Sequence, residues 1–242
     1  MDPERIKAIL LFPIRDTYAR KQFLIASLMM LLGMIIPIVP IFFLMGYGAR
    51  IARQVVLDKR EPSMTAWDDW SGFFTDGVRI FGIRMIITLP LTLLLVTAIF
   101  SLVLAPILVS TLNPQTAREL TPLSGLAFLL AVGFILVLGI LAIPLQLLVG
   151  AAETHVAVKG SFSAGLQFKE WWPILRKGMG SFLLVYAIVF VLSFVFMIAV
   201  QISAATIILI CILPLIMFPY SAYLLLILQT LFAQAYSQAL TE

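Results

Sequence analysis

The strongest constraint on this chain is that ionisable residues are missing from four long stretches of its sequence. Residues 22–49, 85–117, 120–152 and 178–241 contain no Asp, Glu, Lys, Arg or His. One helical membrane crossing needs about 20 apolar residues, so each stretch can cross once and the last can cross twice. Over the whole chain 62% of residues are hydrophobic and 12% are charged, with a mean hydropathy of +1.10. The sequence therefore predicts an all-α, polytopic integral membrane protein, a bundle of helices.

The first stretch allows two arrangements. It could cross once at 23–45, or form two short helices separated at Pro37 and Pro40, because proline removes a backbone donor and clashes with the preceding turn. Cytoplasmic loops of membrane proteins are enriched in Lys and Arg. Basic residues both precede and follow the stretch, and only a hairpin keeps the two groups on one side. We favour a short or re-entrant hairpin, which gives about six membrane segments, a location in the cytoplasmic membrane and both termini in the cytoplasm.

This scheme makes residues 1–242 a single membrane domain. Its parts are a cytoplasmic surface helix at 1–22, a short hairpin at 23–57, a cytoplasmic segment at 58–84, a second hairpin at 85–150, a second cytoplasmic segment at 151–178, and a third hairpin with its tail at 179–242. The first surface helix should break at Pro13 and turn Ile9 and Phe12 toward lipid. Loops are expected at 113–122 and 201–206. Similar spacing of an acid, Trp and Gly in 69–77 and 170–178 suggests a hairpin repeated three times.

The segment 58–84 holds a cluster of aromatic and acidic residues. Thr65-Ala-Trp-Asp68 has the form of a capping box, and on the helix it would start, the rings of Trp67, Trp70 and Phe74 share one face. A helix with aromatic residues on one face and charged residues on the opposite face lies at a membrane surface, where Trp and Tyr are enriched. The residues expected at the membrane interface or at a partner surface are Tyr47, Trp67, Asp68, Asp69, Trp70, Asp76, Trp171 and Trp172.

Several of these residues also carry a resemblance to a known family. The motifs are Gly46-Tyr47, then Arg50 and Arg53, Pro62, Trp67-Asp-Asp-Trp70, Asp76-Gly77 and, near the end, Phe232-Ala-Gln-Ala-Tyr236. The chain resembles an uncharacterised, domain-of-unknown-function family of prokaryotic polytopic membrane proteins, in which the proline and the first tryptophan lie closer together. It is also distantly similar to the membrane domain found beside glycerophosphodiester phosphodiesterases. The first resemblance implies a polytopic fold without a defined activity, and the second implies a lipid context.

The sequence contains no pattern that usually carries catalysis. No nucleophile lies beside a base, and neither an HExxH motif nor a glycine-rich phosphate loop is present. Adjacent aspartates on a helix diverge by about 100°, which disfavours a shared metal ion. His155 and Glu153, two residues apart, do not face each other on a helix, so His155 is expected at the interface. We therefore expect no catalytic residue, metal or cofactor, and we attribute the net charge of +4 to cytoplasmic loops rather than to nucleic-acid binding.

The expected function follows from the uncharged spans. Ion pumps and proton-coupled transporters usually keep a charged residue within the membrane. We expect a non-enzymatic protein, either a scaffold or partner subunit or a lipid-handling module, which contacts membrane lipid and a protein partner or a second copy. The alternative is a small transporter or channel with its path at helices broken by Pro37, Pro40, Pro144, Pro214 and Pro219. An intramembrane enzyme is a remote third alternative.

Overall fold

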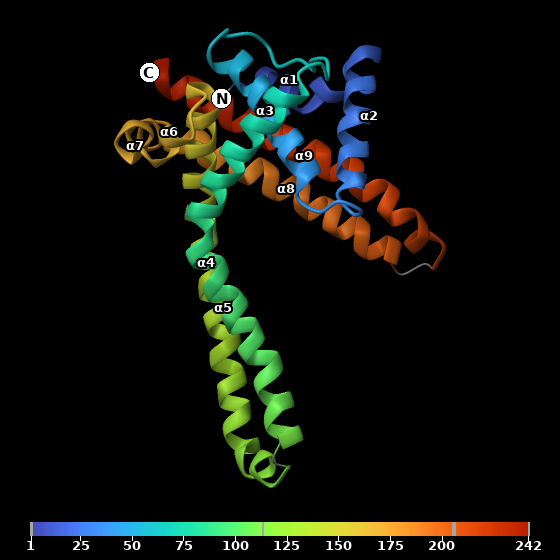
Figure 1. Cartoon of the computed structure of the whole chain (residues 1–242), viewed down its shortest axis with the longest axis vertical. Coiled ribbons are helices and arrows are strands. Elements are labelled where there is room, and N and C mark those ends of the chain that lie inside the picture. Colours follow the sequence, from blue (N-terminus) through green and yellow to red (C-terminus); the bar gives the residue numbers. More distant parts are fainter. Residues whose placement is uncertain (1, 113, 205–206, 242) are drawn as a thin grey trace. The chain divides into compact units, whose positions relative to one another are not determined.

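The computed structural model describes residues 2–112, 114–204 and 207–241, and every regular element in this part of the chain is helical (Figure 1). The elements are α1 (Pro3–Leu11), a 3₁₀ turn η1 (Phe12–Ile14), α2 (Thr17–Leu32), α3 (Val39–Val56), α4 (Trp70–Leu112), α5 (Pro114–Lys159), α6 (Phe162–Leu166), α7 (Phe168–Lys177), α8 (Met179–Ala204) and α9 (Ile207–Thr241). The expected all-α class is confirmed.

The chain divides into two compact units. Met1–Arg84 and Gly150–Glu242 form the first, which we call the head unit, and Met85–Val149 forms the second, which we call the hairpin unit. Each is described by itself below.

Four segments of the described helices are long and apolar enough to cross a membrane. They are Trp70–Leu104, Phe128–Lys159, Met179–Ser203 and Leu215–Thr241. These segments identify a membrane protein. The shorter helices α2 and α3 are not among them, which leaves four candidate crossings instead of about six.

The N-terminal helix breaks where the sequence predicts it. Helix α1 ends at Leu11, Pro13 lies in η1, and α2 begins at Thr17. The expected orientation of its apolar face is wrong, because Ile9 and Phe12 are 1% and 2% exposed. They are covered by protein since α1 packs against α9.

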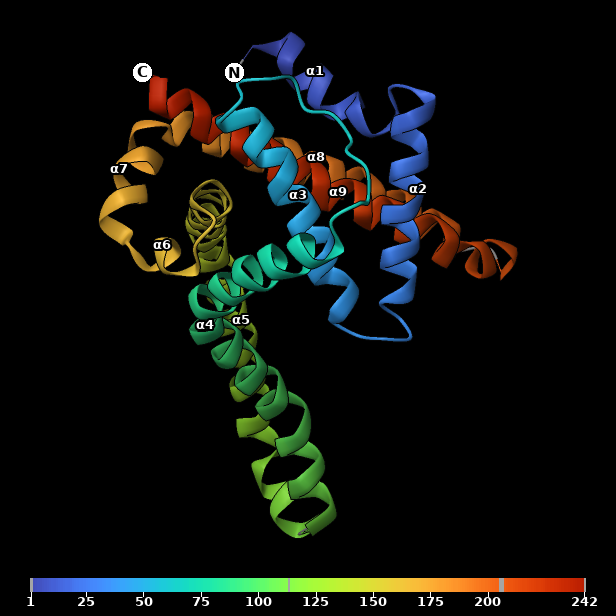
Figure 2. The same cartoon turned by 45° about the horizontal axis from the view of Figure 1, so that its top comes forward.

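Helices α2 and α3 form a hairpin. The chain turns at residues 33–38, with Pro37 in the turn and Pro40 in the first turn of α3, where no backbone donor is needed. Ile38 takes a left-handed φ of 74° just before α3. Both helices pack against α9 (Figure 2). The two short helices predicted from the prolines and the charges are therefore present.

Helix α4 begins later than expected. Residues 58–69 contain no helix, and α4 runs without a break from Trp70 to Leu112. Its first turn is capped by Asp69, whose Oδ1 accepts the N–H of Gly72 at 2.9 Å. The predicted capping box at Thr65 and the separate surface helix are wrong, because Asp69 provides the cap and the residues before it are not helical.

The hairpin unit consists of the apolar parts of α4 and α5, which run side by side in both views (Figure 1, Figure 2). Helix α5 already begins at Pro114, so the loop expected at 113–122 is helical from there on, and residue 113 lies outside the described residues. Leu93, Phe100 and Leu136 are 56%, 59% and 63% exposed. Apolar surface of this extent suits lipid or another apolar protein surface.

The last hairpin is formed by α8 and α9, which pack against each other. The expected turn at 201–206 falls partly on residues 205–206, which lie outside the described residues. Pro214 and Pro219 lie inside α9, and Pro144 lies inside α5, so none of the three ends a helix. Proline is tolerated within apolar membrane helices because neighbouring groups satisfy the freed carbonyl. The helix breaks expected at these three prolines are therefore wrong.

Candidate functional site

The interior of the head unit contains aromatic residues that were expected at the membrane interface. Tyr47 is fully buried and Trp67 is 8% exposed. Their rings stack at a centroid distance of 4.2 Å and an interplanar angle of 10°. The Trp67 Nε1–H donates to the carbonyl of Gln22 at 3.1 Å, which ties the segment before α4 to α2. The expected exposure of both rings is wrong, because the non-helical residues before α4 fold onto α2 and α3.

The hydroxyl of Tyr47 holds the segment before α4 in place. It donates to the carbonyl of Thr65 at 2.7 Å and accepts the N–H of the same residue at 2.9 Å. Burial raises the pKa of Tyr47 to about 12, so the hydroxyl stays neutral at physiological pH and can both donate and accept. The Tyr47 hydroxyl thus hydrogen-bonds both the N–H and the carbonyl of Thr65. In a helix, other backbone groups would have satisfied these two groups.

The three aspartates of this region have separate roles. Asp68 accepts from Arg50 Nη1 at 2.8 Å, and Asp69 caps α4. Asp76 pairs with Arg53 at 2.6 Å and with Arg79 at 3.1 Å. The described part of the chain holds no group of three or more His, Cys, Asp or Glu that could bind a metal ion. These carboxylates stabilise the fold through different partners and do not converge.

The other tryptophans differ in exposure. Trp171 is 3% exposed and donates to the carbonyl of Gly165 at 3.0 Å, so its expected place at the interface is wrong. Trp172 is half-buried and stacks on Phe168 at 4.9 Å, and Trp70 is 41% exposed. Only Trp70 and Trp172 retain surface for lipid or a partner.

The two segments compared as a repeat also differ. Gly178 ends α7, whereas Gly77, its counterpart, lies inside α4. The threefold repeat stays a prediction.

A chain of polar contacts, which we call the polar seam, joins α3, α4 and α5 in the head unit. Arg53 Nε donates to the carbonyl of Ala157 at 2.6 Å. Arg84 binds Glu153 with two hydrogen bonds, Nε to Oε1 at 2.5 Å and Nη2 to Oε2 at 2.8 Å, and Glu153 is 6% exposed. This ion pair was not predicted, although the positions of its two residues in the sequence suggest it. Arg84 directly precedes the uncharged stretch 85–117, and Glu153 directly follows 120–152.

His155 belongs to the same seam and connects α5 to α7 and α9. It is 2% exposed, so its expected place at the interface is wrong. Its Nε2 lies 3.2 Å from Oε2 of Glu170, and its Nδ1 lies 2.6 Å from the hydroxyl of Tyr236. An ionised carboxylate only accepts, so Nε2 carries the proton and Nδ1 accepts from Tyr236. Lys159 lies 3.6 Å from the same oxygen of Glu170 and balances its charge.

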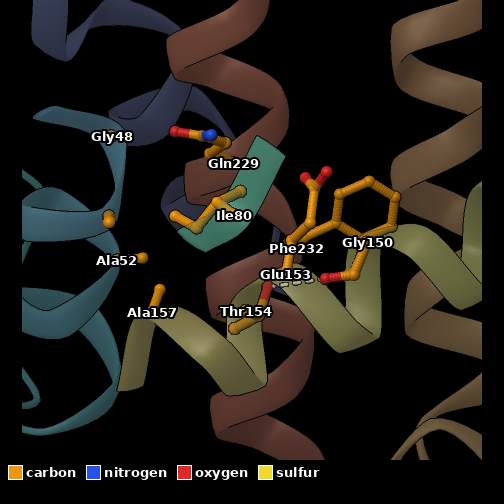
Figure 3. Close-up of a pocket in the computed structure, with 10 residues that line it drawn as sticks. Gly48, Ala52, Ile80, Gly150, Glu153, Thr154, Ala157, Gln229 and Phe232 are labelled. Atoms are coloured by element: carbon orange, nitrogen blue, oxygen red, sulfur yellow. Dashed lines mark hydrogen bonds between the residues drawn. The ribbon is translucent and has the colours of Figure 1, made fainter. Parts of the chain in front are cut away.

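A small cavity of about 10 Å³ lies beside the seam, lined by residues of α3, α4, α5 and α9 (Figure 3). The amide of Gln229 is buried, and neither its nitrogen nor its oxygen has a hydrogen-bond partner in the described structure. This amide lies against Gly48, where a side chain would collide with it. A cavity of this size accommodates about one water molecule and excludes an organic substrate. Among the described residues, the side chains around the seam are therefore closely packed.

Comparison with known proteins gives a match to a family model. The family model described as "Protein of unknown function (DUF4013)" matches residues 29–205, which include α3, α4 and the polar seam up to α7. No curated protein and no solved structure matches the chain. The distant similarity to glycerophosphodiester phosphodiesterase membrane domains stays a prediction. Because the matched residues cover well over half of the sequence, the chain belongs to the DUF4013 family of proteins of unknown function.

Proposed function

We propose that this protein is a non-enzymatic scaffold or partner subunit of a membrane assembly, located in the cytoplasmic membrane with both termini in the cytoplasm. The observation that carries the proposal is the use of buried polar groups for internal contacts. Arg84 and Glu153 bind each other, and His155 is held by Glu170 and Tyr236. A catalytic site would instead keep such groups directed toward a substrate pocket.

The apolar surface of the helices supports a role in assembly. In the head unit, Phe190 and Val195 of α8 are each 60% exposed. The hairpin unit has a similar surface at Leu93 and Leu136. Small clusters of exposed apolar side chains suit lipid, and larger continuous faces suit another membrane helix or a second copy of the chain.

One observation favours the alternative of a transporter or channel. The amide of Gln229 is buried without a partner next to a cavity, as a polar group lining a transport path would be. The cavity of about 10 Å³ holds no more than one water molecule, so a transport path would require α3 and α9 to separate.

Photo-cross-linking in native membranes tests the scaffold role. A photoreactive amino acid at Leu93, Leu136 or Val195 should form a discrete protein adduct, with another chain or with a second tagged copy, from at least one position. The same group at the exposed Lys21 should give none, since that polar surface is not expected to meet a membrane partner. Lipid adducts alone at all three apolar positions would contradict the scaffold role. Solute flux through proteoliposomes of the purified protein would support the transporter.

A further inference from the structure

A wide groove lies on the head unit outside the polar seam. Its volume is about 770 Å³, and it is bounded by α1, by the residues that follow α3 and by the last turns of α9. Ligand sites in proteins commonly have volumes of about 300–1,000 Å³. The groove is therefore large enough for the headgroup of a phospholipid.

The groove has an excess of positive charge. Its basic residues are Arg5, Lys7, Arg15, Lys59 and Arg60, and its acidic residues are Asp2, Glu4 and Glu61. Two of the three acids have partners, because Asp2 accepts the N–H of Glu4 at 3.2 Å as the cap of α1 and Glu61 pairs with Arg15 at 3.1 Å. Asp2 keeps its negative charge as a cap, so four cationic side chains remain in the groove with the carboxylates of Asp2 and Glu4, and the five basic and three acidic residues give a net charge of +2.

These four cations are available for a ligand. Within the described residues, no carboxylate lies within ion-pair distance of Arg5, Lys7, Lys59 or Arg60. All four are exposed. Lys59 has a left-handed φ of 53°, and the next N–H, of Arg60, donates to the carbonyl of Gln54 at 3.1 Å. A defined turn thus holds two of the cations at the groove.

The groove lies at the polar end of a candidate membrane crossing. Gln234, Ser237, Gln238 and Thr241 of α9 line it, at helical spacings that put them on one face. The exposed apolar residues Leu215 and Met217 lie at the other end of the same candidate span, Leu215–Thr241. At ~1.5 Å per residue, residues 215 to 234 cover about 28 Å, close to the ~30 Å thickness of the hydrocarbon core. If Leu215 lies at one face of that core, the groove lies at the level of the headgroups on the other.

We propose that this groove binds the phosphate headgroup of an anionic phospholipid. Arginine binds phosphate oxygens through two parallel N–H bonds and lysine binds them as a point charge. The amide and hydroxyl groups of Gln238 and Ser237 can bond to the glycerol part of a headgroup. Basic pockets at the cytoplasmic ends of membrane helices are suited to such headgroups, and the lipid is already present at that depth. The inference does not depend on a scaffold role, because an isolated copy of the chain would carry the same groove.

The test uses the full chain in a neutral detergent and measures binding by titration calorimetry. The probes are short-chain phosphatidylglycerol, short-chain phosphatidylcholine and inorganic phosphate. The groove variant carries Arg5→Gln, Lys7→Gln, Lys59→Gln and Arg60→Gln. The matched control carries Lys21→Gln, Lys169→Gln, Arg176→Gln and Lys177→Gln, four exposed cations outside the groove, so both variants lose the same charge. The double variant Lys59→Gln/Arg60→Gln leaves α1 unchanged and covers the case in which the fourfold variant fails to fold.

Phosphatidylglycerol should bind the wild type and the control with similar affinity, and bind the groove variant at least about tenfold more weakly. The double variant should lose affinity in the same direction by a smaller factor. Phosphatidylcholine and free phosphate should both bind more weakly than phosphatidylglycerol. Equal loss in the control and the groove variant would overturn the proposal, because it would show a general effect of charge. Free phosphate binding as tightly as the lipid would also overturn it.

Discussion

Replacing Gly46 with alanine should destabilise the head unit by about 3 kcal/mol, which is at the upper end for overpacking. A Cβ at Gly46 of α3 would collide with the backbone carbonyl of Phe73 in α4. The contact is reciprocal, because a Cβ at Gly77 of α4 would collide with the carbonyl of Phe42 in α3. Backbone atoms cannot rotate away as the end of a side chain can, so the two helices would have to separate. Close approach of helices through glycine is a common way to pack membrane helices.

The control for this prediction is Gly180→Ala in α8. An added Cβ there meets no atom within 4 Å. Its effect should stay within about 1 kcal/mol and should be stabilising, since alanine favours a helix over glycine by roughly that amount. Thermal unfolding in detergent, followed by circular dichroism, compares the two variants. Equal midpoints for Gly46→Ala and Gly180→Ala would contradict the close crossing of α3 and α4.

Replacing Glu153 with methionine should destabilise the protein by about 3 kcal/mol. The substitution roughly keeps the volume of the side chain but removes the bidentate partner of Arg84. Removal of one member of a buried ion pair typically costs about 3–5 kcal/mol, and we expect the lower end because the Arg84 side chain is 32% exposed. The double variant Arg84→Met/Glu153→Met should recover at least half of that loss, since it also removes the charge whose carboxylate partner was lost. The same unfolding measurement applies.

The surface pair Arg15–Glu61 is the matched control for the buried pair. Its side chains are 64% and 72% exposed, and pairs of this kind contribute about 0–1 kcal/mol. Glu61→Gln should therefore leave the unfolding midpoint nearly unchanged. If the double variant at Arg84 and Glu153 were less stable than Glu153→Met alone, the buried ion pair would not be the source of the stability.

The helices themselves could be predicted from the sequence, and so could the turn at Pro37 and Pro40. Apolar stretches and prolines determine local helix formation, so they can be recognised in the sequence. The basic residues on both sides of the first apolar stretch favoured a hairpin there. The burial of the aromatic residues inside the head unit could not be predicted. Periodicity shows that Trp67 has an apolar environment, but it does not distinguish lipid from the ring of Tyr47. The start of α4 was missed because Thr65 and Asp69 can each cap a helix, and the hydrogen bond of Trp67 to Gln22 holds the residues before Asp69 outside the helix.

The polar seam could be predicted only in part. The spacing correctly separated His155 from Glu153, but its actual partners, Glu170 and Tyr236, come from α7 and α9. Contacts between residues distant in sequence are not encoded in local spacing. The prolines at 144, 214 and 219 were overinterpreted, because an apolar environment preserves the remaining hydrogen bonds of the helix.

The N-terminal helix, the residues after α3 and the end of α9 line one groove of the head unit, and we expect all three on one side of the membrane. The most direct measurement is labelling of single cysteines at Lys7, Lys59 and Ser237, introduced one at a time in a Cys211→Ser background, with a membrane-impermeant maleimide. All three should be protected in intact cells and labelled in inside-out vesicles, because all three line one groove. Labelling of one position in intact cells while the other two stay protected would show that these segments do not share one side of the membrane.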